Sequence, residues 1–166
     1  MRTIWIILLL SLGLASPCLA RSPKAGQPAP DFTVQTLDGR SLRLAELGSQ
    51  VVLVHFWATW CSSCREEMPA LERFYRLHHK DGLEVIAISI EDRSDIDLVR
   101  KVAAAYSYPA ALAADADLAG FGRVWVLPLS FVIDRRGLLR IAGWTGEQRI
   151  DDASLGARIL PLLDER

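Results

Sequence analysis

Cys61 and Cys64 are separated by two serines, and their type and spacing are the strongest indication of chemistry in this chain. They follow the apolar run at residues 51–57, whose β-branched side chains are typical of a strand buried on both faces. A helical pattern comes next, so a helix should begin near Ser62 with Cys61 at its amino end. Free N–H groups and the helix dipole stabilise an anion there, so we expect the pKa of Cys61 to lie below that of an ordinary cysteine.

A thiolate in this position predicts thiol–disulfide exchange, because the thiolate is the attacking species in that reaction. Cys64 lies one turn inside the expected helix, should face inward, and could close a disulfide with Cys61. Ser63 and Glu66 also have the spacing of a capping box for the same helix start.

Two structural roles for the cysteine pair compete with this interpretation. A purely stabilising disulfide would close a very short loop, so its entropic contribution would be small. A structural zinc ion needs four ligands, and the further candidates are His55, His78 and His79, of which the last two lie far along the helix. We therefore favour redox chemistry, and we expect neither a metal nor a cofactor.

The elements that must position the cysteines alternate between strands and helices. Asp38 and Gly39 predict the turn of an amino-terminal hairpin over residues 31–44. The other expected elements are helices from residue 62 to Gly82, over 98–106 and over 150–163, and strands over 51–57, 83–90, 129–134 and 138–142. This order, a β-hairpin followed by βαβα and ββα, predicts an α/β fold with a mixed central sheet flanked by helices.

The composition fits one globular domain. The chain has 166 residues, of which 51% are hydrophobic and 23% charged, with a formal net charge of −1. No run of like charges is present, so we expect no nucleic-acid partner. Residues 21–30 are rich in proline and glycine and predict a linker, and residues 31–166 form the domain.

The amino terminus has the pattern of an export signal. Arg2 precedes an apolar run that is shorter than the roughly 20 residues a membrane-spanning helix needs, and we interpret residues 1–20 as a signal peptide cleaved after Ala20. This places the protein in the periplasm or at the outer face of the cytoplasmic membrane, soluble after cleavage. A lipid anchor on Cys18 is the alternative, which Pro17 disfavours.

The chain resembles the TlpA/ResA group of exported bacterial thiol–disulfide oxidoreductases, and the resemblance extends over about residues 28–164. It rests on a combination of segments rather than on the cysteines alone: PAPDF at 28–32, LDG at 37–39, FWATWCSSC at 56–64, EEMP at 66–69 and VLPLSFVID at 126–134. The resemblance implies a thioredoxin-like fold with the amino-terminal β-hairpin as an addition.

The resemblance also implies roles for residues around the cysteines. Pro128 would be a cis-proline beside the dithiol, although the residues alone would favour an ordinary proline at a strand start. The backbone at Leu127 would face the sulfurs and pair with an extended substrate segment. Trp60 and Trp57 would pack around the site, with Trp60 shielding the sulfurs.

An acidic residue near the cysteines serves the group as a proton relay. Alignment places Asp92 at that position with Glu91 as its rival, and two solvated loop carboxylates are the alternative for both. His55 stands where the group often has asparagine. It could tune Cys61, but a histidine satisfied inside the sheet is the favoured interpretation.

Together these features predict an exported enzyme that exchanges the Cys61–Cys64 pair with protein substrates. The resemblance favours the reducing direction, for example in cytochrome c maturation, with a membrane-bound electron donor. Three alternatives remain open: a peroxiredoxin-like antioxidant, a Sco-like copper-binding assembly factor, and a non-catalytic binding module.

Overall fold

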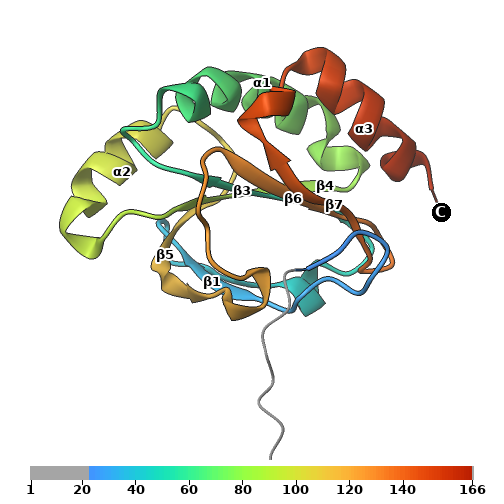
Figure 1. Cartoon of the computed structure of the whole chain (residues 1–166), viewed down its shortest axis with the longest axis horizontal. Helices are drawn as coiled ribbons and strands as arrows, with labels where there is room; N and C mark the ends of the chain where they lie inside the picture. The colour runs from blue at the N-terminus through green and yellow to red at the C-terminus, as the bar shows by residue number, and fades with distance from the viewer. Residues whose placement is uncertain (1–22, 166) are drawn as a thin grey trace, which may run out of the picture.

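A computed structural model describes residues 23–165 as a seven-stranded sheet packed against three α-helices (Figure 1). The predicted signal peptide and Cys18 lie outside the described residues. The strands are β1 (Thr33–Thr36), β2 (Ser41–Arg43), β3 (Val51–Trp57), β4 (Leu83–Ser89), β5 (Ala110–Asp117), β6 (Leu129–Ile133) and β7 (Leu139–Thr145). The α-helices are α1 (Ser62–His78), α2 (Ile96–Ala103) and α3 (Asp152–Asp164).

Strand β3 lies inside the sheet, between β4 and β6. The strand order is β2-β1-β5-β4-β3-β6-β7, in which β4 is parallel to both β3 and β5 and all other neighbours are antiparallel. All seven residues of β3 pair with β4, five also pair with β6, and the whole strand is buried. The apolar run therefore has neighbours at both edges and on both faces. The predicted mixed α/β sheet and its amino-terminal hairpin, β1 and β2, are confirmed.

Strand β5 corrects the predicted element order, which has no strand between α2 and β6. Its sequence, AALAADAD, consists of alanine, aspartate and one leucine, and the first two have low strand propensity. The segment is extended because it lies between two strands, parallel to β4 and antiparallel to β1. Tertiary pairing has overridden the local preference.

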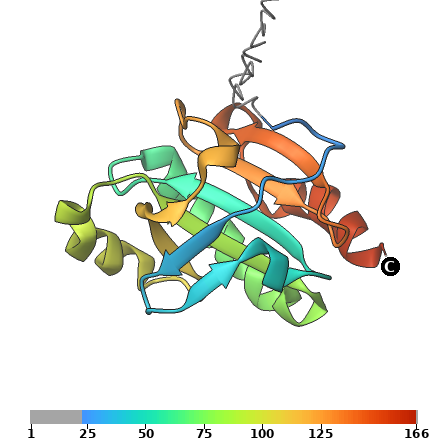
Figure 2. The ribbon, with the colours of Figure 1, turned by 90° about the horizontal axis from the view of Figure 1, so that it is seen from below.

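Two apolar clusters cover the two faces of the sheet. The first joins α1 and α3 to odd-numbered residues of β3, such as Leu53 and Trp57, and includes Val99 of α2. The second joins the even-numbered residues of β3 to β1 and to Phe121 of a short 3₁₀ helix. Figure 2 shows this second face, with the β1–β2 hairpin in front.

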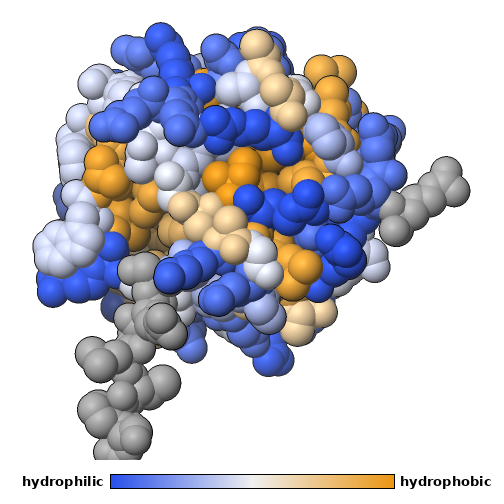
Figure 3. Space-filling model, turned by 45° about the vertical axis from the view of Figure 1, so that its right-hand side comes forward, coloured by the Kyte–Doolittle hydropathy of each residue, from blue (hydrophilic) through white to orange (hydrophobic). Residues whose placement is uncertain are grey.

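The surface is largely hydrophilic on the face that Figure 3 presents, with apolar side chains in separate patches. No helix among residues 23–165 is long and apolar enough to cross a membrane. The part of the expected linker that the structure describes lies along the β6–β7 turn. There the N–H of Gly26 donates to the carbonyl of Leu139 (2.7 Å), and the N–H of Ala29 donates to that of Gly137 (2.9 Å).

Arg135, in the β6–β7 turn, joins three segments at the edge of the sheet opposite the cysteines. Its guanidinium donates to the carbonyl oxygens of Ser49 (2.6 Å), Asp81 (2.6 Å) and Leu163 (3.1 Å). These residues precede β3, precede β4 and end α3, so one side chain fixes the starts of both central strands against a helix end.

Replacing this guanidinium should destabilise the fold. We expect Arg135→Ala to lower the free energy of unfolding by about 1–3 kcal/mol, since three backbone carbonyls from separate segments lose one shared charged donor. Urea denaturation with the disulfide intact measures this. Arg76→Ala, which removes an exposed arginine of α1, is the control and should change stability little. Equal losses in the two variants would contradict the assignment.

Candidate active site

The two cysteines form a disulfide at the amino end of α1. The S–S distance is 2.05 Å, and Cys61 is the N-cap residue of the helix. Cys61 retains 7% exposure whereas Cys64 has none. The predicted arrangement, an outer sulfur on Cys61 and an inward-facing Cys64, is confirmed.

Cys61 itself caps the helix, which corrects the expected capping box. Its Sγ accepts the N–H of Cys64 at 3.2 Å, so the sulfur occupies the place of the side-chain oxygen in an ordinary cap. Because the helix begins two residues earlier than that box requires, Ser63 lies in its first turn, and Glu66 instead pairs with Arg149 (2.9 Å).

Two polar groups are directed at the Cys61 sulfur. One is the N–H of Cys64, and the other is the hydroxyl of Ser63, whose Oγ lies 3.5 Å from Sγ. Hydrogen bonds to the charged form of a group favour that form. In the reduced protein these two donors would therefore stabilise a thiolate on Cys61, in addition to the helix dipole.

A groove of about 480 Å³ runs past the outer cysteine. Its wall on the far side is the loop before β6, where a cis peptide bond precedes Pro128, as the resemblance implies. The groove brings Cys61 together with two of the other expected site residues, Trp60 and Leu127. Pro128, the next residue in the sequence after Leu127, is buried. The complete lining is Trp60, Cys61, Ser62, Ser63, Ile90, Val124, Trp125, Val126 and Leu127.

Trp125 and Val126 are groove residues that the sequence does not single out. Trp125 is 78% exposed and Val126 is 50% exposed, and Trp60 across the groove is 67% exposed. The guanidinium of Arg123 lies over the Trp125 ring, 4.4 Å from its centroid. The signal in the sequence is large apolar side chains in a loop directly before a proline.

The two candidate acids occupy different environments. Glu91 is buried against the cysteine loop, where the N–H of Thr59 donates to one of its oxygens at 2.9 Å. Asp92 is exposed and precedes a short 3₁₀ helix. The structure therefore brings Glu91, and not Asp92, toward the segment that carries Cys61.

Glu67 is a buried acid that the sequence analysis does not identify as a site residue. It lies on α1 three residues after Cys64, is 2% exposed, and accepts the N–H of Ile150 at 3.1 Å. Its second oxygen has no hydrogen-bond partner among the described residues. Burial raises the pKa of this carboxyl. Its position on the apolar stripe with Cys64, Met68 and Leu71 is the signal that could have identified it.

His55 is fully buried in β3, as the favoured interpretation expects, but it is only half satisfied, because its Nε2 has no hydrogen-bond partner among the described residues. Its Nδ1 lies 2.9 Å from Oγ of Ser130, its register partner on β6. Burial lowers its pKa to about 4, so the imidazole is neutral at physiological pH.

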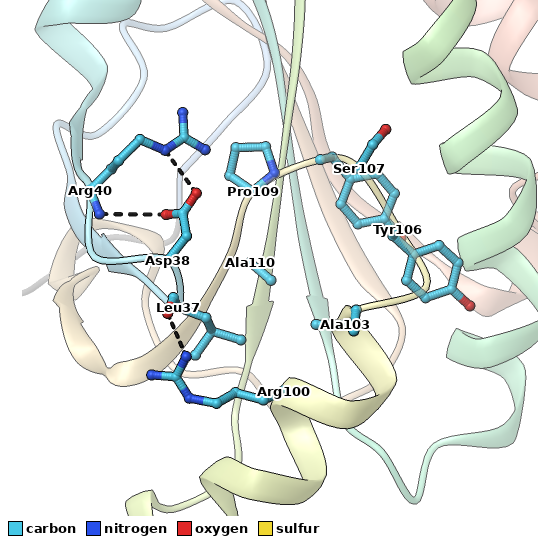
Figure 4. Close-up of a pocket in the computed structure, with 11 residues that line it drawn as sticks. Leu37, Asp38, Arg40, Arg100, Ala103, Tyr106, Ser107, Pro109 and Ala110 are labelled. Carbon is cyan, nitrogen blue, oxygen red and sulfur yellow. Dashed lines mark hydrogen bonds and ion pairs between the residues drawn. The ribbon is translucent and has the colours of Figure 1, made fainter.

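A separate cavity of about 330 Å³ lies between the hairpin turn and the end of α2 (Figure 4). It contains neither cysteine, and its two arginines already have partners. Arg40 pairs with Asp38 (2.9 Å), and Arg100 donates to the carbonyl of Leu37 (2.5 Å). No group of three or more potential metal ligands of the histidine, cysteine or carboxylate type occurs within residues 23–165.

Comparison with known proteins identifies similar chains. Residues 25–142 match the AhpC/TSA family. The chain is 35% identical over 114 residues to the thiol-disulfide oxidoreductase ResA of Bacillus thuringiensis, covering 68% of this chain but only 65% of that relative. It is 30% identical over 148 residues to ResA of Geobacillus thermodenitrificans, covering 84% and 83%. A secreted thiol-disulfide isomerase structure from Corynebacterium glutamicum shares 25% identity at a TM-score of 0.68, covering 82% and 86%.

The buried Glu67 should make stability depend on pH. A carboxyl whose pKa is higher in the folded than in the unfolded chain favours folding below its ordinary value of about 4.5, and this contribution is lost as the pH rises through the raised pKa. Glu67→Gln does not titrate, so we expect its stability relative to the wild type to increase from pH 4 to pH 8.

Urea denaturation across this pH range, with the disulfide intact, measures the effect. Glu66→Gln changes the exposed neighbour on the same helix and is the matched control. The assignment fails if the stability difference between Glu67→Gln and the wild type is the same at both ends of the range.

Proposed function

Because the chain belongs to the AhpC/TSA family and, within it, to the ResA-like group, we propose that it is a thiol-disulfide oxidoreductase acting on protein substrates. The observation that carries the proposal is the asymmetry of the cysteine pair. Cys61 caps a helix and borders a groove, whereas Cys64 is sealed behind it. A substrate sulfur can therefore reach Cys61, whereas Cys64 can react only with Cys61.

The exchange proceeds in two displacements. In the reduced protein the Cys61 thiolate attacks a substrate disulfide, a new S–S bond forms between protein and substrate, and the second substrate sulfur leaves as a thiolate. Cys64 then gives up its proton and attacks Sγ of Cys61, which releases the first substrate sulfur and closes the Cys61–Cys64 disulfide. Two electrons pass to the substrate, and the reverse sequence oxidises a dithiol.

The groove supplies the docking site in this proposal. Trp60 and Trp125 line the groove together with Cys61 and keep most of their aromatic surface exposed, and large exposed apolar surfaces are typical of binding sites. An extended substrate segment beside Leu127 could pair with its backbone while a neighbouring side chain enters the groove. Pro128 keeps the loop turned toward the sulfurs.

The cellular setting belongs to the same proposal. Export is supported by the signal-peptide pattern at residues 1–20. The reducing direction, a membrane-bound electron donor and a role such as cytochrome c maturation are supported by the resemblance to the TlpA/ResA group.

The cysteine variants test the two displacements. Cys61→Ser should reduce the rate of protein disulfide reduction to the uncatalysed background, because the attacking sulfur is gone. Cys64→Ser should accumulate mixed disulfides with substrates, since nothing displaces the bound sulfur. Non-reducing electrophoresis and mass spectrometry of the trapped species measure this.

Leu77→Ala, on the exposed side of α1, is the control and should react like the wild type. Retained exchange in Cys61→Ser would refute the proposal. Consumption of hydrogen peroxide at a rate above that of disulfide exchange would favour a peroxiredoxin-like activity instead.

Truncating Trp125 tests the groove. We expect Trp125→Ala to raise KM roughly 5- to 30-fold for a disulfide peptide with a large apolar residue beside its cysteine, because about 1–2 kcal/mol of apolar contact is lost. The kcat should change little, since the sulfurs are untouched. A peptide with glycine at the flanking position is the control substrate, and an equal loss for both peptides would rule out the groove as a docking site.

A further inference from the structure

Glu91 has no part in the two displacements, yet it lies directly beside the cysteine loop. It follows the end of β4 by two residues, just as Thr59 follows the end of β3. Because Trp57 and Ser89 are register partners in this parallel pair, the two segments leave the sheet side by side. The N–H of Ile90 continues the pairing by donating to the carbonyl of Trp57 at 3.1 Å.

Three donors converge on the two oxygens of the Glu91 carboxylate. Oε2 accepts the N–H of Thr59 (2.9 Å) and the hydroxyl of Ser89 (2.9 Å), while Oε1 accepts the hydroxyl of Thr59. The N–H of Glu91 in turn donates to Oγ of Ser89 at 3.2 Å. The carboxylate is therefore bound by a hydroxyl at the end of its own strand and accepts both hydrogen-bond donors of Thr59.

The Thr59 contacts bear on Cys61 through a short piece of backbone. The turn between β3 and α1 consists of the four residues 58–61, and the N–H of Cys61 closes it by donating to the carbonyl of Ala58 (3.1 Å). Thr59 is the first of the two central residues of this turn and is itself buried. Because Cys61 follows Thr59 by two residues in this turn, holding Thr59 in place also sets the orientation of the Cys61 sulfur.

We propose that Glu91 is a positioning residue, whose carboxylate fastens Thr59 to the end of β4 and so sets the orientation of Cys61 for attack. This inference rests on the proposed function. It differs from a proton relay, because both carboxylate oxygens are occupied by donors from the scaffold and the residue acts through Thr59.

The experiment compares both partners of this contact in the reduced full-length protein. Glu91→Gln replaces one acceptor oxygen with an amide N–H₂, and Thr59→Val removes the hydroxyl while leaving the acid in place. Each should lower kcat/KM for a disulfide peptide about tenfold, the loss expected for one hydrogen bond to a charged group. The double variant should be no slower than the slower single variant, because both changes break one contact.

A second readout follows the sulfur without substrate turnover. The rate of alkylation of Cys61 by iodoacetamide, measured against pH in a Cys64→Ser background, reports both the ionisation and the accessibility of the thiolate. Glu91→Gln and Thr59→Val should displace this profile in the same direction. Thr59→Ser keeps both donors and should restore the wild-type profile, which a side chain serving only to fill space would not do.

Asp95→Asn is the matched control, since it neutralises an exposed acid four residues further along the same connection and should leave both readouts unchanged. The inference is overturned if Thr59→Val behaves like the wild type while Glu91→Gln loses activity, which would indicate a proton carrier, or if the two losses multiply in the double variant. Absence of exchange in the wild type would instead refute the proposed function, and the alkylation profiles would still test the positioning role.

Discussion

The register of the central strands determines where every part of the site lies. Trp57 of β3 pairs with Ser89 of β4 in parallel, and Phe56 pairs with Leu129 of β6 in the antiparallel direction. The residues after 57, after 89 and before 129 must therefore meet at one edge of the sheet. These three segments carry the cysteine pair, Glu91 and the cis-proline loop. A shift of β3 by one residue would send its two sets of buried side chains to the wrong faces and would separate these segments.

Groups around the cysteines differ in whether they stabilise a negative charge on the Cys61 sulfur. The N–H of Cys64, the Ser63 hydroxyl and the helix dipole favour a negative sulfur on Cys61. Glu67 is a buried carboxyl on the same helix, and the His55 imidazole, kept neutral by burial, offers no positive charge. A less stable thiolate makes the reduced protein a better electron donor. The balance of these influences on Cys61 therefore sets how readily the reduced pair gives up its electrons.

The sequence predicts the site well where local pattern and tertiary structure agree. The strand at residues 51–57 and the helix start near Ser62 follow from an apolar run and a change of period, and both are confirmed. The alanine-rich β5 could not be predicted because its neighbours, not its side chains, make it a strand. Glu67 was missed for a related reason, since an acid on a helix is normally solvated, and the contact with the N–H of Ile150 comes from a segment far away in the sequence. Similarly, the choice between Glu91 and Asp92 depends on which side chain the end of β4 turns inward.

The two exposed tryptophans of the groove differ from the buried pair. Within residues 23–165, Trp57 and Trp144 are almost completely buried, whereas Trp60 and Trp125 keep most of their surface in water. Leaving such surface exposed gives up a hydrophobic contribution that burial elsewhere in the fold would have provided. Both rings line the groove beside Cys61, the cysteine that a substrate can reach. A docked substrate segment would cover them. Contact with the groove would therefore hold a substrate disulfide beside Cys61 while the first displacement occurs, so that binding and chemistry share the same few residues.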